Sequence, residues 1–398
     1  MAAAQAQSWV GESGGLLSNP KRMEASLMEA GARHLVTSFL GRYISTGSLI
    51  LMEEGGTIFT FKGNKRKSSL KVVLKVHRPQ FYWKVMTRAD LGLASAYIDG
   101  DFSFTDKNDG LLNLFMSNEL FALFLGESMQ YSCAVFKKED EDLNVAQQRK
   151  ISLLIEKARI DEKHEVLEIG CGWGIFAIQV VKQTGCKYTG ITLSEEQLKF
   201  AEKKVKDAGL QDNIRFLLCD YRQLPDANKY DRIIACEMIE HVGHEFIEEF
   251  FSCCESVLAE DGVLVLQFSS LPDARYEEYR KSSEFMKEYI FPGICVPSLS
   301  RVISAMAAAS RLSVEHVENI GHHYYQTLRS WRKFFMENQR EILALGFDEK
   351  FIRTWEYYFD YCAAGFKTCT VANYQVVFTR PGNVAAFGNP YQSLPWGF

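Results

Sequence analysis

A short apolar strand followed by three alternating glycines constrains this chain more than any other stretch. Residues 166–174 read Val-Leu-Glu-Ile-Gly-Cys-Gly-Trp-Gly, and residues 175–182 continue with a helical pattern. Glycine takes positive φ without steric cost and lets the backbone lie against a ligand. The helix that comes next directs the positive end of its dipole at that ligand. The stretch therefore predicts a ligand-binding turn at the end of a buried strand.

The spacing of Gly170, Gly172 and Gly174 argues against a dinucleotide-binding loop, which needs G-x-G-x-x-G. The run here is E-x-G-x-G-x-G, so an acid, Glu168, stands at the approach to the loop. An acid beside the ligand suits a cationic or amino-bearing molecule better than a diphosphate. This spacing resembles the first motif of S-adenosylmethionine methyltransferases, whose ligand carries a sulfonium and an ammonium. The alternative is an ordinary strand-to-helix turn without a ligand.

Strand-like and helical segments alternate beyond residue 147, which predicts a parallel sheet covered by helices. Strands are expected over 166–169, 187–191, 214–218, 230–235, 262–268, 314–319 and 373–379, and helices over 147–158, 195–208 and 245–258. Ligands of such sheets bind at the carboxyl ends of the strands. The predicted rim is therefore 170–174, 192–194, 220–222, 237–243 and 267–270. The aromatic-rich segments 276–297 and 321–361 read as helices that roof the site.

A chain of 398 residues is long enough for two or three domains. Ahead of the parallel sheet, the pattern predicts a small α+β domain with a helix over 23–43, a meander of three strands over 48–77, and helices over 88–98 and 109–118. The expected divisions are a flexible lead (1–20), this α+β domain (21–120), a linker and cofactor-closing segment (121–146), the sheet domain (147–382) and a tail (383–398).

Positive charge is concentrated in one segment, although the net charge of the chain is −5. Residues 62–88 contain nine basic residues and no acid: Lys62, Lys65, Arg66, Lys67, Lys71, Lys75, Arg78, Lys84 and Arg88. The segment predicts an anionic partner, either nucleic acid or a lipid surface, or else a solvated sheet face. Near an anionic membrane each basic residue contributes about 1 kcal/mol. Since no nucleic-acid recognition motif occurs and the pI is about 6.0, we expect a phospholipid bilayer surface rather than nucleic acid.

Cysteine and histidine spacing points to no metal site and to no disulfide framework. The ten cysteines form no C-x-x-C pair, and the eight histidines show no metal-ligand spacing. The longest apolar runs fall short of the about 18 residues that a membrane span needs, and residues 1–20 lack the pattern of a secretory signal. We therefore expect a cytoplasmic protein in a reducing compartment that associates peripherally with membranes.

Four motifs stand in chain order around the predicted sheet. They are Gln130-Tyr131-Ser132-Cys133, Gly-Ile-Thr-Leu-Ser at 190–194 with Gln197 in the next helix, Glu240-His241-Val242-Gly243, and Tyr-Ile-Phe-Pro at 289–292. Together they resemble the cyclopropane-fatty-acid-phospholipid synthase family, and residues 363–366 (Ala-Ala-Gly-Phe) are most similar to its plant-type branch. The resemblance covers about residues 85–380. It implies an α/β class I methyltransferase (Rossmann-like) fold: a mostly parallel seven-stranded sheet with a helical roof, plus the small N-terminal α+β domain.

The resemblance also implies a reaction. The methyl group of S-adenosylmethionine is transferred to a cis double bond of a phospholipid acyl chain, and loss of a proton from that methyl closes a cyclopropane ring. An alkene is a weak nucleophile, so the enzyme must hold it in line with the sulfonium in a dry site. Two alternatives stay open: a methyltransferase that makes a methyl-branched lipid or N-methylates a small amine, and a lipid-surface binding protein with a relic cofactor fold. The N-terminal domain would be the docking unit or a homodimer contact.

The resemblance assigns the cofactor to residues of the rim. The methionine end would contact Glu168, Gly170, Gly172 and Gly174 under Tyr131 and Ser132, the ribose Thr192 and Gln197, and the adenine Asp220 and Tyr221. For Asp220 a turn cap is the alternative role.

The base implied by the resemblance is a bound bicarbonate held by a carboxylate, a tyrosine, a histidine and main-chain groups. The matching carboxylate is Glu240, the tyrosine is Tyr324, and Cys133 offers a main-chain contact. The histidine does not carry over, because Gln267 stands in its place, and glutamine donates a hydrogen bond but cannot accept the proton. We expect bicarbonate to bind through Glu240, Tyr324 and Gln267. Cys362 matches the family's active-site cysteine, but the sequence shows no activating base beside it.

Overall fold

The computed structural model describes residues 26–43, 46–62, 66–104, 124–125, 127–225, 229–345 and 347–389. The chain divides into two compact units, Met1–Leu114 with Asp348–Asp360, and Phe115–Phe347 with Tyr361–Phe398. The expected sheet domain included residues 348–360, whereas the structure groups them with the N-terminal unit. The reason is local contact: Lys350 pairs with Asp99 at 2.8 Å and the hydroxyl of Tyr97 donates to Glu356 at 3.2 Å.

The first unit is a four-stranded sheet in the order β2-β1-β3-β4. Its elements are α1 (Leu27–Tyr43), β1 (Thr46–Glu53), β2 (Ile58–Lys62), β3 (Arg66–Val76), α2 (Gln80–Ile98) and β4 (Phe102–Phe104). β1, β2 and β3 were foreseen and β4 was not. The predicted meander is wrong, because β3 pairs in parallel with β1 instead of pairing with β2. β1 carries a continuous apolar run, Leu-Ile-Leu-Met, in which Leu51 is fully buried in the core of this unit and Leu49 packs against it. The helix expected over 109–118 lies outside the described residues.

A buried acid ties the first unit together. Glu53 accepts two hydrogen bonds of 2.6 Å from the Arg33 guanidinium and one of 2.7 Å from the Tyr82 hydroxyl. Arg33 lies on α1, Glu53 on β1 and Tyr82 on α2, so hydrogen bonds to one carboxylate join three elements. A buried charge is tolerated when it is paired and hydrogen-bonded in this way.

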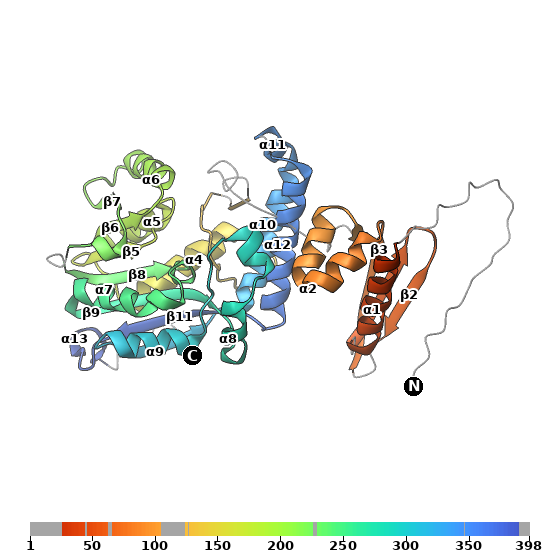
Figure 1. Ribbon diagram of the computed structural model, residues 1–398. Helices are drawn as coiled ribbons and strands as arrows, with labels where there is room; N and C mark the ends of the chain where they lie inside the picture. The colour runs from red at the N-terminus through yellow and green to blue at the C-terminus, as the bar shows by residue number, and fades with distance from the viewer. Residues whose placement is uncertain are drawn as a thin grey trace. The chain divides into compact units, whose positions relative to one another are not determined.

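The second unit is built on a seven-stranded sheet in the order β10-β11-β9-β8-β5-β6-β7. The strands are β5 (Glu165–Ile169), β6 (Lys187–Thr192), β7 (Ile214–Leu218), β8 (Tyr230–Cys236), β9 (Leu258–Ser270), β10 (Ser313–Asn319) and β11 (Ala372–Thr379). β5 to β9 pair in parallel, while β11 runs antiparallel to both β9 and β10. The mostly parallel seven-stranded sheet that the sequence predicted is confirmed (Figure 1).

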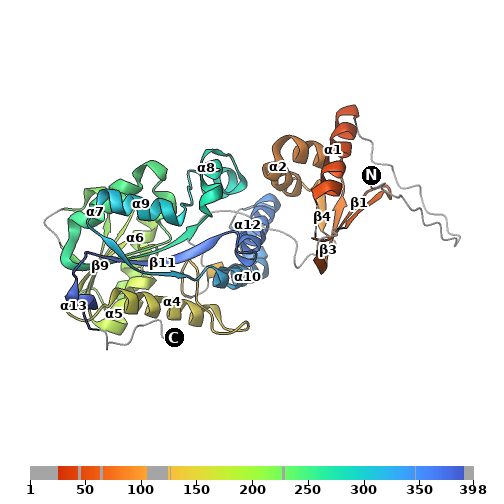
Figure 2. The same cartoon turned by 90° about the horizontal axis from the view of Figure 1, so that it is seen from below.

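Helices cover both faces of this sheet. Successive residues of a strand point to opposite faces: Val166 belongs to the core under α4 (Leu143–Ala158), α5 (Ile175–Thr184) and α6 (Glu195–Asp207), and Leu167 to the core under α7 (Ile247–Val257) and α9 (Leu299–Ala309). Figure 2 shows α4 and α5 on one side of the sheet and α7 and α9 on the other. Strands with apolar residues on both faces are those of a sheet between two helical layers.

The predicted helical roof is present near the carboxyl ends of the strands. Its elements are α8 (Asp273–Lys281), the π-helical turn η4 (Met286–Ile290), α10 (His322–Glu337), α11 (Gln339–Ala344) and the last turns of α12 (Glu349–Lys367), from Tyr361 onwards. Short 3-10 turns come after β7 and β8: η1 (Tyr221–Gln223), η2 (Ile239–His241) and η3 (His244–Phe246). The chain closes with α13 (Val384–Phe387). Within the described residues, no helix is long and apolar enough to cross a membrane.

Candidate active site

The three loop glycines take positive φ, as expected, but they serve different purposes. The φ values are 84° at Gly170, 51° at Gly172 and 76° at Gly174. A Cβ on Gly172 would meet no atom within 4 Å, whereas one on Gly174 would lie 2.6 Å from the Ala201 Cβ. Gly170 and Gly172 line a cavity and Gly174 does not. The predicted contact of Gly174 with the cofactor is therefore replaced by close packing of the loop against α6.

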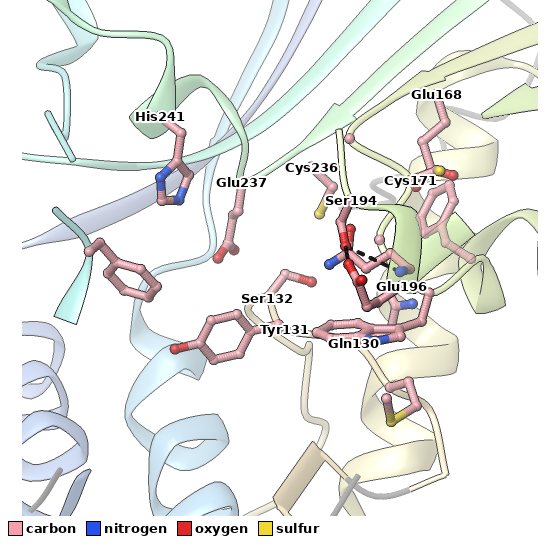
Figure 3. A pocket seen from close by; sticks show the side chains of 17 residues that line it. Gln130, Tyr131, Ser132, Glu168, Cys171, Ser194, Glu196, Cys236, Glu237 and His241 are labelled. Atoms are coloured by element: carbon pink, nitrogen blue, oxygen red, sulfur yellow. Dashed lines mark hydrogen bonds between the residues drawn. The ribbon is translucent and has the colours of Figure 1, made fainter. Parts of the chain in front are cut away.

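A cavity of about 540 Å³ opens beside this loop (Figure 3). Its volume falls in the range of small-molecule sites. Six of the predicted cofactor residues line it, namely Tyr131, Ser132, Glu168, Gly170, Gly172 and Gln197. Lining residues that the sequence analysis did not assign include Gln130, Trp173, Phe176, Glu196, Cys236, Glu237, His241 and Phe291. The cavity thus joins the carboxyl ends of the parallel strands to the segment before α4 and to the roof.

Glu168 is the buried acid of the cavity. Its carboxylate accepts a hydrogen bond of 3.0 Å from the Tyr188 hydroxyl. Burial raises the pKa of Glu168 to about 8, and Tyr188 and the charge of Lys150 only partly oppose this shift. A cationic ligand beside Glu168 would lower this raised pKa, because nearby positive charge favours the ionised form of a carboxyl.

Lys150, which the sequence analysis did not single out, holds the closing segment. Its fully buried ammonium donates hydrogen bonds of 2.9 Å to the Gln130 side-chain oxygen and to the Ser132 hydroxyl. Both acceptors line the cavity. The predicted closing role of residues 131 and 132 thus has a buried support on α4.

The predicted ribose pair is only half in the cavity. Thr192 is buried, and its hydroxyl donates to the Gln197 side-chain oxygen at 2.9 Å. That bond leaves the Gln197 NH₂ group to face the cavity, which Gln197 lines while Thr192 does not. Glu196, in the first turn of α6, adds a carboxylate to the cavity lining beside Gln197.

The predicted adenine pair lies outside the cavity lining. The Asp220 carboxylate caps η1 by accepting from the Arg222 backbone, and it also pairs with the Arg222 guanidinium at 2.6 Å. The Tyr221 ring packs edge-on against Phe250, with ring centroids 5.4 Å apart. The turn cap considered for Asp220 is present, and neither side chain lines the cavity.

The centre of the polar network is Glu237, to which the sequence analysis gave no role of its own. Oε1 accepts from the Cys133 backbone N at 2.9 Å and from Gln267 Nε2 at 2.8 Å. The same oxygen accepts from Asn373 Nδ2 at 2.9 Å, while Oε2 accepts from the Tyr324 hydroxyl at 2.5 Å. Three donors that were expected to hold bicarbonate therefore have a protein carboxylate as their acceptor. Bicarbonate as predicted does not fit beside them.

Glu240 lies behind this network. It is buried, it does not line the cavity, and its Oε1 accepts from the Ser269 backbone N at 2.6 Å. Its Oε2 is buried without a hydrogen-bond partner among the described residues. Burial, assisted by the negative charge of Glu237, raises the pKa of Glu240 to about 8. A buried carboxyl with a second acid beside it is favoured in its neutral form.

The two candidate thiols lack the surroundings of a nucleophile. Burial and the nearby Glu237 charge raise the pKa of Cys133 well above its ordinary value. Burial likewise raises the pKa of Cys362, whose sulfur contacts the Met286 sulfur at 3.7 Å. Neither residue lines the cavity. Cys133 donates its main-chain N–H to Glu237, where the resemblance implied a contact with bicarbonate, and the structure gives Cys362 a packing role.

A cationic methyl donor fits the residues that are present. Gly172 leaves open space for the ligand, and Glu168 offers a buried carboxylate to its positive charge. Glu196 and Gln197 offer polar groups to its ribose hydroxyls, and all four residues line one cavity. The missed residue Glu237 had one signal in the sequence: it stands directly after a strand and opens the predicted rim segment 237–243.

The family model for mycolic acid cyclopropane synthetase matches residues 112–376. The chain is 35% identical to tuberculostearic acid methyltransferase UfaA1 of Mycobacterium tuberculosis over 67% of this chain and 64% of that protein. It is 31% identical to cyclopropane-fatty-acyl-phospholipid synthase of Escherichia coli over 77% of this chain and 87% of the relative.

Solved structures extend the similarity to three dimensions. The mycolic acid cyclopropane synthase CmaA1, solved in complex with SAH and CTAB, superimposes with a TM-score of 0.61 at 28% identity, covering 66% of this chain and 94% of the other. The second unit therefore has the class I fold of S-adenosylmethionine-dependent methyltransferases.

Proposed function

This chain belongs to the mycolic acid cyclopropane synthetase family of S-adenosylmethionine-dependent enzymes, and from that premise we propose that it cyclopropanates unsaturated phospholipid acyl chains. The methyl group would be added to a cis double bond, and loss of a proton would close the ring. One observation carries the proposal: a carboxylate, Glu237, and the glycine loop line the same cavity as the rings of Tyr131 and Phe291. A cation formed there has aromatic faces and a negative charge around it.

The residues of the cavity divide the work between binding and chemistry. S-adenosylmethionine, when bound, supplies an electrophilic methyl group. Gly170 and Gly172 leave room for it, and Glu168 offers a carboxylate to its positive charge. The ring of Tyr131 packs between Phe291 and Trp331, with centroid distances of 6.1 and 5.1 Å. These rings give the site an apolar wall, and a weak nucleophile such as an alkene reacts best where water is kept away.

A methyl-branched lipid is the second candidate product, because UfaA1, a relative at 35% identity, is named a tuberculostearic acid methyltransferase. N-methylation of a small amine is the third, since the Glu237 carboxylate lines the cavity and would face an ammonium group there. All three products begin with transfer of the same methyl group. They differ in the acceptor and in the steps after the transfer.

The test is an assay of the purified full chain with vesicles of oleoyl phospholipid and methyl-labelled S-adenosylmethionine. We expect the label in the lipid extract, and gas chromatography with mass spectrometry should show a 14-dalton gain in the acyl chain. Proton NMR of the product should show cyclopropane protons. An exomethylene or methyl-branched signal selects the second candidate, and label confined to the aqueous phase with an added amine selects the third.

Docking of the N-terminal unit on a bilayer remains part of the proposal. The basic segment supports it less than its charge count suggests, because Lys84 pairs with Asp99 and Asp101 at 2.7 and 2.6 Å, and Arg78 pairs with Asp101 at 3.2 Å. α1 adds an apolar contribution instead. Met28, Leu35 and Phe39 recur at helical spacing, and 66%, 58% and 59% of their surfaces are exposed. A helix with exposed apolar side chains on one face suits a peripheral membrane contact.

A further inference from the structure

Because the carboxylate of Glu237 takes up the donors that the resemblance assigned to bicarbonate, we propose that Glu237 is itself the proton acceptor of the reaction. The inference rests on the proposed function, since it names the base for that same site. It replaces a dissociable anion by a side chain of the protein. The Gln267 position, where the expected histidine is absent, then needs only to donate a hydrogen bond.

The hydrogen-bond pattern leaves one oxygen of Glu237 for the substrate. Oε1 accepts from three N–H donors, on Cys133, Gln267 and Asn373, at 2.8–2.9 Å. Oε2 accepts one hydrogen bond, from the Tyr324 hydroxyl. Each carboxylate oxygen carries two lone pairs. Oε1 is therefore saturated, and Oε2 retains a lone pair that can take a proton.

The orientation of the Gln267 amide is set by a buried cation two side chains away. An ammonium can only donate, so Lys157 must donate to the Gln375 oxygen, which lies 2.5 Å from it. The Gln375 NH₂ group then donates to the Gln267 oxygen at 2.8 Å, and the Gln267 NH₂ group is left to face Glu237. Lys157 is itself paired with Glu318. Gln375 and Gln267 stand opposite each other on β11 and β9, so the sheet register fixes this relay.

The Glu237 side chain faces the cavity rather than the protein interior. Figure 3 shows its carboxylate projecting between His241 and Ser132, both of which line the cavity with it. The His241 ring packs edge-on against Phe291 at a centroid distance of 5.5 Å. A carbocation held against this aromatic ring would have the Glu237 carboxylate in the same cavity.

Glu240 is a poorer base on geometric grounds. It does not line the cavity, and its Oε1 is occupied by the Ser269 backbone N. The raised pKa of Glu240, about 8, also leaves it protonated at neutral pH. Its neutral carboxyl lies behind Glu237 and is better suited to supporting the network than to removing a proton.

The proposed step balances in atoms and electrons. The carbon–sulfur bond of the donor breaks with its electron pair left on sulfur, and the π pair of the alkene forms the new carbon–carbon bond, which leaves a cation on the neighbouring carbon. Glu237 Oε2 then accepts a proton from the added methyl carbon. The electron pair of that C–H bond forms the second carbon–carbon bond of the ring. The products are the cyclopropane, a neutral thioether and a protonated Glu237, which returns its proton to solvent.

The backbone at Glu237 suggests the sharpest variant. Glu237 has a φ of 52°, in the left-handed region where only glycine is free of strain. Glu237→Gly therefore removes the carboxylate and relieves the backbone at once. It leaves a carboxylate-sized space bordered by the donors of Cys133, Gln267, Asn373 and Tyr324. Formate or bicarbonate should fill that space.

The experiment compares wild type, Glu237→Gln, Glu237→Gly and the exposed control Glu245→Gln with oleoyl phospholipid vesicles in carbon dioxide-free buffer. We expect wild type to make the same amount of product with and without added bicarbonate. Glu237→Gln should lose about 10²- to 10⁴-fold in kcat, the usual contribution of general base catalysis. Glu237→Gly should recover activity with formate or bicarbonate, whereas Glu237→Gln should not. Glu245→Gln should match wild type.

A trideuteromethyl donor gives a readout that a structural role would not move. If Glu237 removes the proton, C–H cleavage becomes rate-limiting in Glu237→Gln and the isotope effect on ring formation rises above that of wild type. Wild type that is inactive until bicarbonate is added, or Glu237→Gln with the wild-type kcat, overturns the inference while leaving the proposed function intact. Absence of methylated lipid with wild type in every arm overturns both. Should Glu237→Gln fail to fold, wild-type bicarbonate independence and Glu237→Gly rescue decide between the two outcomes.

Discussion

The hydroxyl of Tyr324 donates a hydrogen bond of 2.5 Å to Oε2 of Glu237, across 87 positions of the chain. The Tyr324 ring is itself held against Phe366, with ring centroids 4.4 Å apart. The roof helix α10 and the end of β8 thus meet at one oxygen atom, and the aromatic packing of the roof decides where that oxygen is held.

Tyr324→Phe should lower kcat and leave KM nearly unchanged. The variant keeps the ring packing but removes the donor that positions Oε2 of Glu237. The expected loss is about 10- to 100-fold, since a hydrogen bond to a charged group contributes about 1.5–3 kcal/mol. Steady-state kinetics on oleoyl phospholipid checks it, with Tyr325→Phe on the same helix as the matched control. An equal loss in both variants would point to helix packing instead.

The scaffold was predictable from the sequence, but this contact was not. Strands such as β5, with Val166 and Leu167 in the cores of opposite faces, are recognisable from local apolar pattern, and the glycine loop marks the ligand end of the sheet. Glu237 fell within the predicted rim, yet its role depends on donors from β9, β11 and α10 that only tertiary structure brings together. The parallel pairing of β1 with β3 was missed for the same reason: pairing partners are not encoded in strand pattern.

Binding of S-adenosylmethionine should release a proton below pH 8. The pKa of Glu168 is about 8 in the free protein, and a cationic ligand favours the carboxylate. Below that pH the ligand must displace the proton, so affinity should fall as pH falls, by at most about tenfold per pH unit. Calorimetry at pH 7 in two buffers of different ionisation enthalpy measures the proton release. Glu168→Gln should bind more weakly and release none; a release equal to that of wild type would assign the proton to another group.

Glu240→Gln should flatten the dependence of stability on pH. The pKa of Glu240, about 8 in the folded state, exceeds its value in the unfolded chain, about 4.3. A raised carboxyl pKa stabilises the fold fully at low pH, and this stabilisation is lost as the pH rises from about 4.3 to about 8. The slope is at most about 1.4 kcal/mol per pH unit. Urea unfolding at pH 5, 6.5 and 8 should show wild type losing stability relative to the variant, and parallel curves would contradict the assignment.

Gly174→Ala and Gly172→Ala should separate packing from ligand contact. A Cβ on Gly174 would lie 2.6 Å from Ala201 Cβ and 2.8 Å from the Phe216 ring, so overpacking adds to the strain of positive φ. These effects cost about 1–3 and about 1–2 kcal/mol respectively. Gly172→Ala meets open space and should lose only the second amount, but its methyl group enters the cavity. Thermal unfolding should rank Gly174→Ala as the less stable variant. Calorimetry should show that Gly172→Ala binds S-adenosylmethionine more weakly than wild type, although its stability is the less affected of the two.

Met28→Ser combined with Leu35→Ser should weaken binding to anionic vesicles. Both side chains are exposed on α1, and burying an apolar side chain of this size contributes about 1.5–3 kcal/mol. A loss of at least about tenfold in partition coefficient is therefore expected, measured by sedimentation with vesicles of phosphatidylglycerol and phosphatidylcholine.

Val384→Ser, which changes an equally exposed apolar residue of the second unit, is the control and should bind as wild type does. Higher salt should weaken binding of wild type and double variant in the same proportion, because the basic residues are unchanged. Equal partitioning of wild type and the double variant would exclude α1 from the membrane contact.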